Sequence, residues 1–215
     1  VQGGSVAYVD RLALALRKAG ADLRAGAPIR SLTRDAAGVA LRPEGGAEER
    51  FDQVILATHS DQALALLTDA SAEERQALSA IRFQPNRAVL HADPSVMPRR
   101  RRCWASWVSH GQTDGQGVGV SYWMNRLQNI PEEDALFVTL NPRQPIDERL
   151  IYDQTDFYHP VFDRAALDAQ DRIATLQGQR NTWFAGAWLR NGFHEDGFAS
   201  AVRIARRLLP ARVTP

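Results

Sequence analysis

The chain has 215 residues, 44% hydrophobic and 24% charged, a composition typical of a folded globular protein. Its 26 basic and 25 acidic residues leave a net charge of +1, which favours neither nucleic acid nor an anionic membrane as a partner. The single cysteine, Cys103, excludes an internal disulfide, and no cluster of thiols and histidines indicates a metal site. Apolar runs such as residues 54–57 are far too short to span a membrane, and no charged start leads into a signal segment. We therefore expect a cytoplasmic protein that acts on a small molecule.

The first residues indicate a chain that starts inside a loop. The first residue is Val1 rather than Met, and Gly3 and Gly4 follow closely, so we expect this sequence to be part of a longer protein. Apolar residues at helical spacing then predict a helix over residues 5–19, with Ser5 as its N-cap and Gly20 as its terminator.

The next segments alternate between strand and helix patterns. Short β-type runs cover residues 27–32 and 38–42, and a longer one covers 51–57. Helical spacing follows over 60–67, with Ser60 or Asp61 as the cap. Ser71 and Glu74 match a capping box for a helix that ends near Ile81.

Beyond residue 85 the pattern changes to strands separated by turns that contain Pro, Gly and Asp. The predicted strands are 87–91, 103–108, 118–122 and 136–140, and we expect them to form an antiparallel domain. After a Pro-containing linker at 142–147, the sequence predicts a helix over 164–176, a short buried strand over 182–185 and a last helix over 196–209.

One pair of segments carries the most specific signal. Residues 184–187 read Phe-Ala-Gly-Ala, and residues 192–201 read Gly-Phe-His-Glu-Asp-Gly-Phe-Ala-Ser-Ala. Together they resemble the closing cofactor motif of flavin-containing amine oxidases and phytoene-desaturase-like enzymes. With residues 122–128, 138–142 and 159–160, the chain is similar to a subgroup of predicted FAD/NAD-binding proteins. Some members of that subgroup are associated with cyclopropane-fatty-acid synthases.

The resemblance implies an FAD site at the start of the last helix. A helix N-terminus offers unpaired N–H groups and the positive end of a dipole, which suit the C2 carbonyl and N1 of a flavin. The family pattern assigns Gly186, Glu195, Asp196 and Gly197 to the cofactor, with the N–H groups of Asp196 and Gly197 at the pyrimidine edge. In the competing interpretation, Glu195 and Asp196 only cap a surface helix and His194 is an ordinary loop histidine.

Two earlier strands fit the same family. Residues 28–32 resemble the strand that pairs with the adenine, with Ile29 as the contact, and residues 51–59 resemble the strand beneath the dinucleotide, with Ala57 and Thr58 close to it. Taken alone, such an apolar strand is more often part of a core.

The sequence also departs from the family in two ways. It contains no G-x-G-x-x-G turn to hold the pyrophosphate, and we expect that turn upstream of Val1. The strand at residues 86–91 has no lysine, whereas many amine oxidases place one near the flavin N5. This argues against amine oxidation with fast reoxidation by oxygen.

The resemblance identifies no catalytic residue, and it describes the substrate site in less detail than the cofactor site. The resemblance places five residues at the substrate: Asn86, His91, Tyr122, Trp123 and Asn125. Strand aromatics, including Trp104 and Trp107, either wall an apolar cavity or fill a core. Ser106, His110 and Asp114 lack the loop that nucleophilic catalysis needs, so chance composition is the better explanation.

The predicted fold is α/β (α+β): part of an FAD-binding Rossmann-like domain, residues 1–83 and 165–215, with an inserted antiparallel β-rich substrate domain, residues 84–164. The predicted function is FAD-dependent hydride transfer from a substrate C–H bond to flavin N5, possibly on a lipid or acyl substrate. Two alternatives remain, a non-catalytic scaffold with a degenerate flavoprotein fold and a flavin-dependent desaturase or isomerase. We also expect this chain to self-associate.

Overall fold

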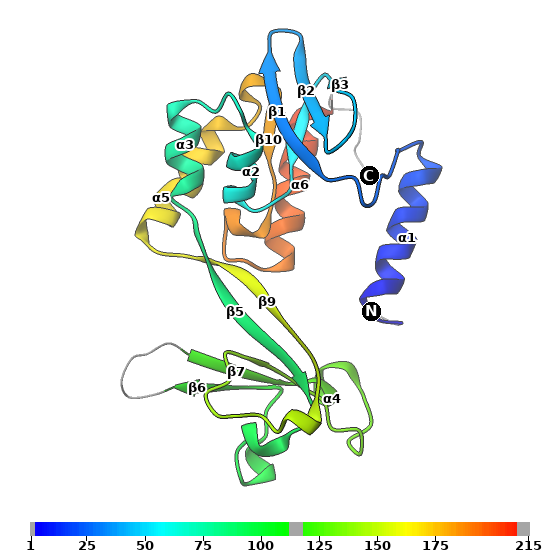
Figure 1. The fold of residues 1–215 in the computed structure, drawn as a ribbon, viewed down its shortest axis with the longest axis vertical. Coiled ribbons are helices and arrows are strands. Elements are labelled where there is room, and N and C mark those ends of the chain that lie inside the picture. Colours follow the sequence, from blue (N-terminus) through cyan, green and yellow to red (C-terminus); the bar gives the residue numbers. More distant parts are fainter. Residues whose placement is uncertain (1–2, 112–117, 210–215) are drawn as a thin grey trace. The chain divides into compact units, whose positions relative to one another are not determined.

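The computed structural model describes residues 3–111 and 118–209 (Figure 1). The chain divides into two compact units. The first unit lies within residues 1–80 and 167–215, and the second within residues 81–166. Helices and mainly antiparallel sheets make the fold α/β, as the sequence predicts.

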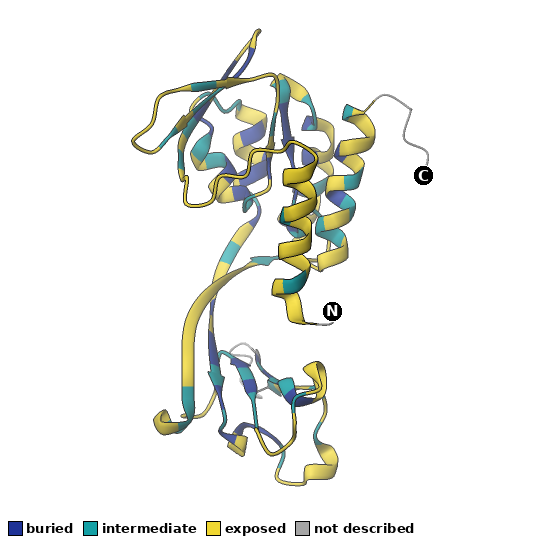
Figure 2. Ribbon diagram, turned by 90° about the vertical axis from the view of Figure 1, so that its right-hand side faces the viewer, coloured by how far each residue is buried: buried dark blue, intermediate teal, exposed yellow. Residues whose placement is uncertain are grey.

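The first helix of the first unit has no buried residue. Helix α1 (Gly4–Lys18) has Gly3 as its N-cap, with φ at 85°, so the expected cap at Ser5 is wrong. Gly20, with φ at 86°, follows the helix end as expected. Large apolar residues of α1 are exposed, among them Val9 at 56% and Leu12 at 46%, and Figure 2 shows most of this helix in the colour of exposed residues.

Four short strands follow α1, and they belong to two sheets. Strands β1 (Ile29–Asp35), β2 (Gly38–Pro43) and β3 (Glu49–Phe51) form an antiparallel sheet in that order. Strand β4 (Val54–Leu56) instead pairs in parallel with β10 (Thr182–Phe184). The single strand expected over 51–57 is therefore wrong, because the chain leaves the first sheet after Phe51 and enters the second at Val54.

The helices of the first unit follow the sequence signals closely. In α3 (Ala72–Ser79) the capping box is confirmed, since Ser71 Oγ accepts from the Glu74 N–H at 3.1 Å and Glu74 Oε2 accepts from the Ser71 N–H at 2.7 Å. Helix α2 (Ser60–Leu66) has His59 as its N-cap rather than Ser60 or Asp61. Helix α5 (Arg164–Leu176) has the predicted bounds, and α6 (His194–Leu208) begins two residues earlier than expected.

A buried ion network stabilises the first unit. The Arg34 side chain has no exposed area and forms two hydrogen bonds to Glu74, Nη1 to Oε1 at 2.5 Å and Nη2 to Oε2 at 2.8 Å. Its Nε donates to Asp69 Oδ1 at 3.0 Å, and Arg180 Nη2 donates to Asp69 Oδ2 at 2.5 Å. The network joins strand β1, helix α3 and the residues before β10.

The second unit is a five-stranded antiparallel sheet in the order β6-β7-β8-β5-β9. Its strands are β5 (Arg82–His91), β6 (Trp107–Gly111), β7 (Val118–Trp123), β8 (Phe137–Leu140) and β9 (Ile151–Val161), with the short helix α4 (Met124–Gln128) after β7. The 3-10 helices of the two units are Pro94–Val96, Arg101–Cys103, Glu148–Leu150, Gln179–Asn181 and Ala187–Leu189.

One expected strand of this sheet has the wrong bounds, and one observed strand was not expected. The strand expected at 103–108 starts only at Trp107, because a 3-10 turn occupies residues 101–103. Strand β9 was not expected at all. It is an edge strand exposed along most of its length, so Asp153, Asp156 and Pro160 leave no alternating apolar pattern to detect.

Candidate functional site

The strongest candidate site lies in the first unit, where β4 and β10 end side by side. Their parallel pairing runs from Thr182 opposite Val54 to Phe184 opposite Leu56, and the Ala185 N–H continues it by donating to the Leu56 carbonyl at 2.9 Å. Parallel strands present their carboxyl ends at one edge, which is where open α/β sheets bind ligands. Ala57 and Thr58 leave one strand there, and Gly186 leaves the other.

The backbone at Gly186 admits no other residue. Its φ of 155° is rare for residues with a side chain, and a Cβ would lie 2.4 Å from Nε1 of Trp188. That indole nitrogen donates to the carbonyl of Thr58 at 3.0 Å, and Trp188 is only 4% exposed. The close packing of Gly186 on Trp188 therefore ties the loop after β10 to the end of β4.

Helix α6 begins directly against this loop. The N–H groups of Asp196 and Gly197 donate to the Phe193 carbonyl, at 3.0 and 3.2 Å. These two N–H groups, which the family pattern assigns to the flavin, thus take part in the first hydrogen bonds of the helix. Within the described residues, the N–H groups of His194 and Glu195 are the ones at the helix start that have no acceptor.

The Asp196 side chain shapes the same turn. Its Oδ2 accepts from the backbone N–H of Phe193 at 3.1 Å and of Asn191 at 3.2 Å. A carboxylate in the first turn also interacts favourably with the positive end of the helix dipole. Asp196 therefore has a structural role here that is independent of any ligand.

The surface around the start of α6 is open and partly apolar. Phe193 is 69% exposed and Phe198 is 63% exposed, and Ala57 is exposed as well. At Gly197 an added Cβ would approach protein atoms no closer than 3.6 Å, the distance to the Ala187 nitrogen. Backbone and apolar rings beside unpaired N–H groups suit a flat ring system that carries a carbonyl oxygen.

The remaining cofactor prediction, Ile29, belongs to another sheet. Ile29 begins β1 and pairs with Pro43 of β2, and the pairing shifts register between Ile29 and Ser31. The structure thus brings Ala57, Thr58, Gly186, Glu195, Asp196 and Gly197 into one turn region and leaves Ile29 in the three-stranded sheet.

Two residues that the sequence did not single out hold this region together, Trp188 and Ser200. Ser200 is 2% exposed and bonds to both Gly186 and Gly197. The available signal for Ser200 was its position in α6, where a polar residue faces the interior beside Ile204. Nothing in the sequence indicated that Trp188 would reach back to β4.

The five predicted substrate residues do not form one group in the second unit. Strand register places Asn86 and Tyr122 on one face of the sheet and His91 and Trp123 on the other. The Asn86 amide bonds to His159 Nδ1 at 3.0 Å and accepts from Asn141 Nδ2 at 2.7 Å.

Asn125 is a structural residue. It is 3% exposed, and its Nδ2 donates to the carbonyls of Pro131 at 2.6 Å and Asp134 at 2.9 Å, while its Oδ1 accepts from the Leu136 N–H. These bonds fix the turn between α4 and β8 and satisfy the whole amide.

The aromatic residues divide between core and surface. Trp123 packs edge-on against Trp104, with ring centroids 5.2 Å apart, and joins a core cluster with Phe137. Trp107, by contrast, is 60% exposed on the face that carries Tyr122. The core interpretation is thus confirmed for Trp104 and Trp123, while a cavity wall at Trp107 stays a prediction.

The Ser106, His110 and Asp114 combination does not form in the part of the chain that the structure describes. His110 Nε2 bonds to Ser121 Oγ at 2.9 Å, and Asp114 lies outside the described residues. Within the ranges 3–111 and 118–209, no group of three or more His, Cys, Asp or Glu side chains could hold a metal ion. In those same ranges, no helix has the length and apolarity that crossing a membrane requires.

Comparisons with known proteins gave one matching family model and several solved structures of similar fold. A family model described as flavin containing amine oxidoreductase matches residues 1–129. Among solved structures, a fatty acid isomerase from P. acnes that produces CLA matches with a TM-score of 0.58 and 16% identity, over 86% of this chain and 48% of that one. A reduced UDP-galactopyranose mutase matches with a TM-score of 0.59 and 12% identity, over 87% of this chain and 48% of that one.

A redesigned putrescine oxidase matches with a TM-score of 0.58 and 15% identity, over 96% of this chain and 52% of that one. The chain thus spans about half the length of the solved structures it matches. A search of curated proteins gave no significant match.

Proposed function

Since the chain belongs to the family of flavin-containing amine oxidoreductases, with FAD as cofactor, we propose that it carries the isoalloxazine side of an FAD site in an oxidoreductase. The reaction that we propose is hydride transfer from a substrate C–H bond to flavin N5. The turn region at the ends of β4 and β10 supports this most directly, because it combines a glycine at which no other residue fits with an open helix N-terminus.

The residues of that turn region fit a flavin ring. We propose that the N–H groups of His194 and Glu195 donate to the flavin C2 carbonyl, and that Gly186 and Gly197 allow the ring close to the backbone. The exposed rings of Phe193 and Phe198 would exclude water from its edge. FAD, when bound, supplies the hydride acceptor at N5. The dipole of the fifteen-residue α6 favours negative charge beside its first turn, and so favours the reduced cofactor.

We expect the 215-residue chain alone to bind FAD weakly. Its sequence contains no G-x-G-x-x-G turn, and such a turn places a helix N-terminus beneath the pyrophosphate. Gel filtration of the chain after incubation with FAD tests this expectation. Stoichiometric yellow protein in the eluate would contradict it.

The substrate is proposed at the level of chemical class. A lipid or acyl chain is consistent with the resemblance to proteins associated with cyclopropane-fatty-acid synthases, and one solved structure of the same fold is named a fatty acid isomerase. We also propose that the protein acts in the cytoplasm.

A second candidate reaction is redox-neutral, with hydride returned to the same molecule. Two of the three solved structures named above are an isomerase and a mutase. Strand β5 also has no lysine, and Lys18 is the single lysine of the whole sequence. Neither observation favours an oxidase that depends on rapid reaction with oxygen.

One experiment separates these candidates from each other and from a scaffold. The protein is saturated with FAD under anaerobic conditions and mixed with acyl, amine and carotenoid-like compounds. Lasting loss of the oxidised flavin band supports net oxidation, whereas product formation with an unchanged band supports isomerisation. If FAD gives no saturable change in absorbance or fluorescence at any concentration, the flavin proposal fails and the scaffold interpretation stands.

A further inference from the structure

A chain of four hydrogen-bonded side chains crosses the sheet of the second unit. His91 Nε2 lies 2.8 Å from Thr139 Oγ1, Thr139 Oγ1 lies 2.8 Å from Ser121 Oγ, and Ser121 Oγ lies 2.9 Å from His110 Nε2. The four residues come from β5, β8, β7 and β6 in spatial order. His91, Thr139 and Ser121 are at most 1% exposed, so this polar relay runs through the interior.

The direction of the relay is fixed at its buried end. The backbone N–H of Asp93 donates to His91 Nδ1 at 3.1 Å, so this nitrogen carries no proton. Neutral His91 must then hold its proton on Nε2 and donate to Thr139. Among the described residues, Ser121 is the other hydrogen-bond partner of Thr139 Oγ1, so the single Thr139 proton is given to Ser121, and the Ser121 proton is then given to His110. His110 therefore accepts at Nε2 and carries its own proton on Nδ1.

Burial keeps both histidines in this neutral form. It lowers the pKa of His91, an effect that the Asp93 charge only partly opposes, and it lowers the pKa of His110 as well. Protonating His110 at Nε2 would turn this nitrogen into a donor and leave the Ser121 proton without its acceptor. The fully buried Ser121 hydroxyl is inaccessible to substrate, so the relay controls the tautomer of His110 rather than activating a nucleophile.

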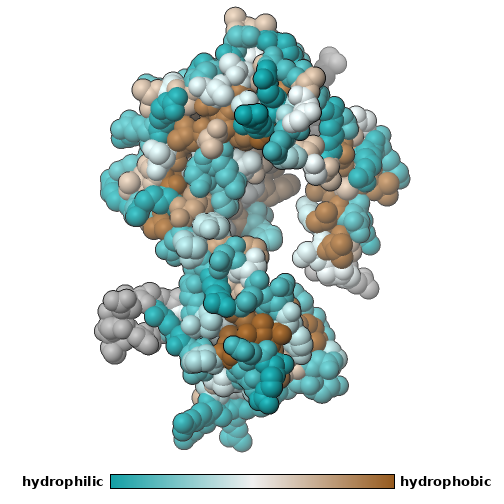
Figure 3. Space-filling view, viewed as in Figure 1, coloured by the Kyte–Doolittle hydropathy of each residue, from teal (hydrophilic) through white to brown (hydrophobic). Residues whose placement is uncertain are grey.

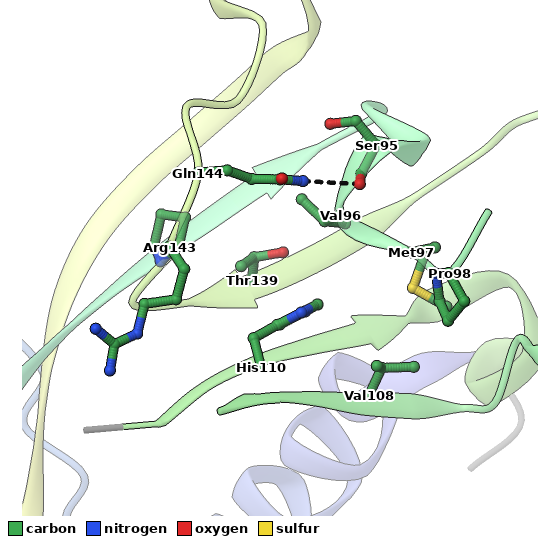
Figure 4. A pocket seen from close by; sticks show the side chains of 10 residues that line it. Ser95, Val96, Met97, Pro98, Val108, His110, Thr139, Arg143 and Gln144 are labelled. Carbon is green, nitrogen blue, oxygen red and sulfur yellow. Dashed lines mark hydrogen bonds between the residues drawn. The ribbon is translucent and has the colours of Figure 1, made fainter. Parts of the chain in front are cut away.

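His110 lines a pocket of about 430 Å³ (Figure 4). Val96, Met97 and Val108 supply apolar wall, and Arg143 lies on the same pocket with His110. Arg143 has an interaction of its own, but a guanidinium has five N–H donors and can serve more than one acceptor. The pocket thus places the His110 imidazole and a cation beside an apolar wall, and among the described residues no carboxylate side chain lines it.

We propose that this pocket binds a small, mainly apolar molecule with a carboxylate, whose oxygen accepts from His110 Nδ1–H next to Arg143. The pocket lies within the second unit, and the proposal does not rest on the proposed flavin region. A cation of the same size would meet the positive charge of Arg143 with no carboxylate among the described lining residues to offset it, so we expect the pocket to discriminate by charge.

The tautomers give the first test. In the full chain labelled with ¹⁵N-histidine, which holds only five histidines, long-range ¹H–¹⁵N spectra at neutral pH should show protonated Nε2 for His91 and protonated Nδ1 for His110. Substitution His110→Phe assigns the His110 signals. The variant Ser121→Ala should release His110 to a mixture of tautomers. A wild-type His110 that is protonated on Nε2 overturns the proposal.

Ligand binding gives the second test, with hexanoate as the probe and hexylammonium as its charge-reversed counterpart. Saturable shifts of the His110 signals by hexanoate and none by hexylammonium are expected. The variant His110→Phe should weaken hexanoate binding about tenfold, as expected for loss of a hydrogen bond to a charged group. Arg143→Gln should weaken it about threefold to fivefold, while the matched control Arg126→Gln, on the exposed side of α4, should leave it unchanged.

The outcomes that overturn the proposal are distinct. Equal shifts with hexanoate and hexylammonium would show that charge plays no part, and the absence of any saturable hexanoate shift would show that the pocket is not a carboxylate site. If His110→Phe fails to fold, Arg143→Gln carries the test alone, because its exposed side chain can change without disturbing the core.

Discussion

The hydroxyl of Ser200 accepts a hydrogen bond from the backbone N–H of Gly186 at 3.0 Å. The same hydroxyl donates to the Gly197 carbonyl at 2.6 Å, so one buried side chain joins the loop after β10 to the first turn of α6. We expect Ser200→Ala to lower the free energy of unfolding by about 1–3 kcal/mol, because two partly buried backbone groups each lose a hydrogen bond to this side chain. It should also weaken FAD binding in a fluorescence titration. The exposed Ser79→Ala is the matched control, and equal effects of the two variants would contradict this role.

Replacing Gly197 with Ala should raise the stability of the protein but weaken its binding of FAD. An Ala Cβ there lies 3.6 Å or more from other protein atoms, and Ala suits a helix better than Gly, so Gly197→Ala should raise the free energy of unfolding by about 0.5–1 kcal/mol. If the flavin ring packs against this backbone, the same methyl should weaken FAD binding about tenfold. Urea unfolding and FAD titration measure the two effects. Higher stability with unchanged FAD affinity would mean that the ring binds elsewhere.

The carboxylate of Asp196 is expected to influence the flavin through charge as well as structure. Asp196→Asn keeps an oxygen acceptor for the Phe193 and Asn191 N–H groups but removes a negative charge from the first turn of α6. Its favourable interaction with the helix dipole should fall by about 0.3–1 kcal/mol. The reduction potential of bound FAD should rise, because a nearby negative charge opposes formation of the reduced anion. Spectroelectrochemical titration of both proteins decides this, and a lower potential in the variant would count against it.

The ion pair between Arg34 and Glu74 predicts a specific sensitivity to acid. Burial opposes ionisation of Glu74, but hydrogen bonds from Arg34 and the Ser71 N–H and the charges of Arg34 and Arg180 outweigh it, so the pKa of Glu74 lies below its ordinary value. A depressed carboxyl pKa adds stability above the unfolded pKa of about 4.3, and that contribution is lost as the pH falls through the lower folded pKa.

Unfolding measured between neutral and acidic pH tests this linkage. At neutral pH, Glu74→Gln should cost about 3 kcal/mol, because it leaves Arg34 buried with Asp69 as its remaining carboxylate partner. The variant should also lose less of its stability than wild type at acidic pH. The neighbouring Glu73 is exposed, so Glu73→Gln should behave like wild type. Parallel pH profiles for all three proteins would refute the assignment.

The exposed apolar face of α1 predicts self-association of the 215-residue chain. Val9, Leu12 and Leu16 are 56%, 46% and 40% exposed, and hydrophobic residues show on the surface of this helix in Figure 3. Exposed apolar patches of this kind favour association. Light scattering should detect a dimer or larger assembly, and Leu12→Glu should shift it towards monomer, whereas Arg11→Glu should not. A wild-type chain that stays monomeric at high concentration would rule this out.

Local sequence signals were sufficient for the elements whose stability is local. The bounds of α5 and the capping box of α3 depend on residues within a few positions of each other, and both match the structure. The same holds for the link between the strand before Gly186 and the helix after it, which a short motif encodes. The fold class and the flavin family could therefore be predicted from the sequence.

The remaining features of the fold and of the proposed sites depend on contacts between residues distant in the sequence. No local sequence pattern indicates such contacts. Edge strand β9 owes its existence to its partner β5, some seventy residues earlier. Trp188 and Thr58 are 130 positions apart, yet their hydrogen bond closes the proposed flavin region. Strand register alone placed His91 and His110 at the two ends of one relay. In each case, the side chains gain their chemical role only when pairing brings separate strands together.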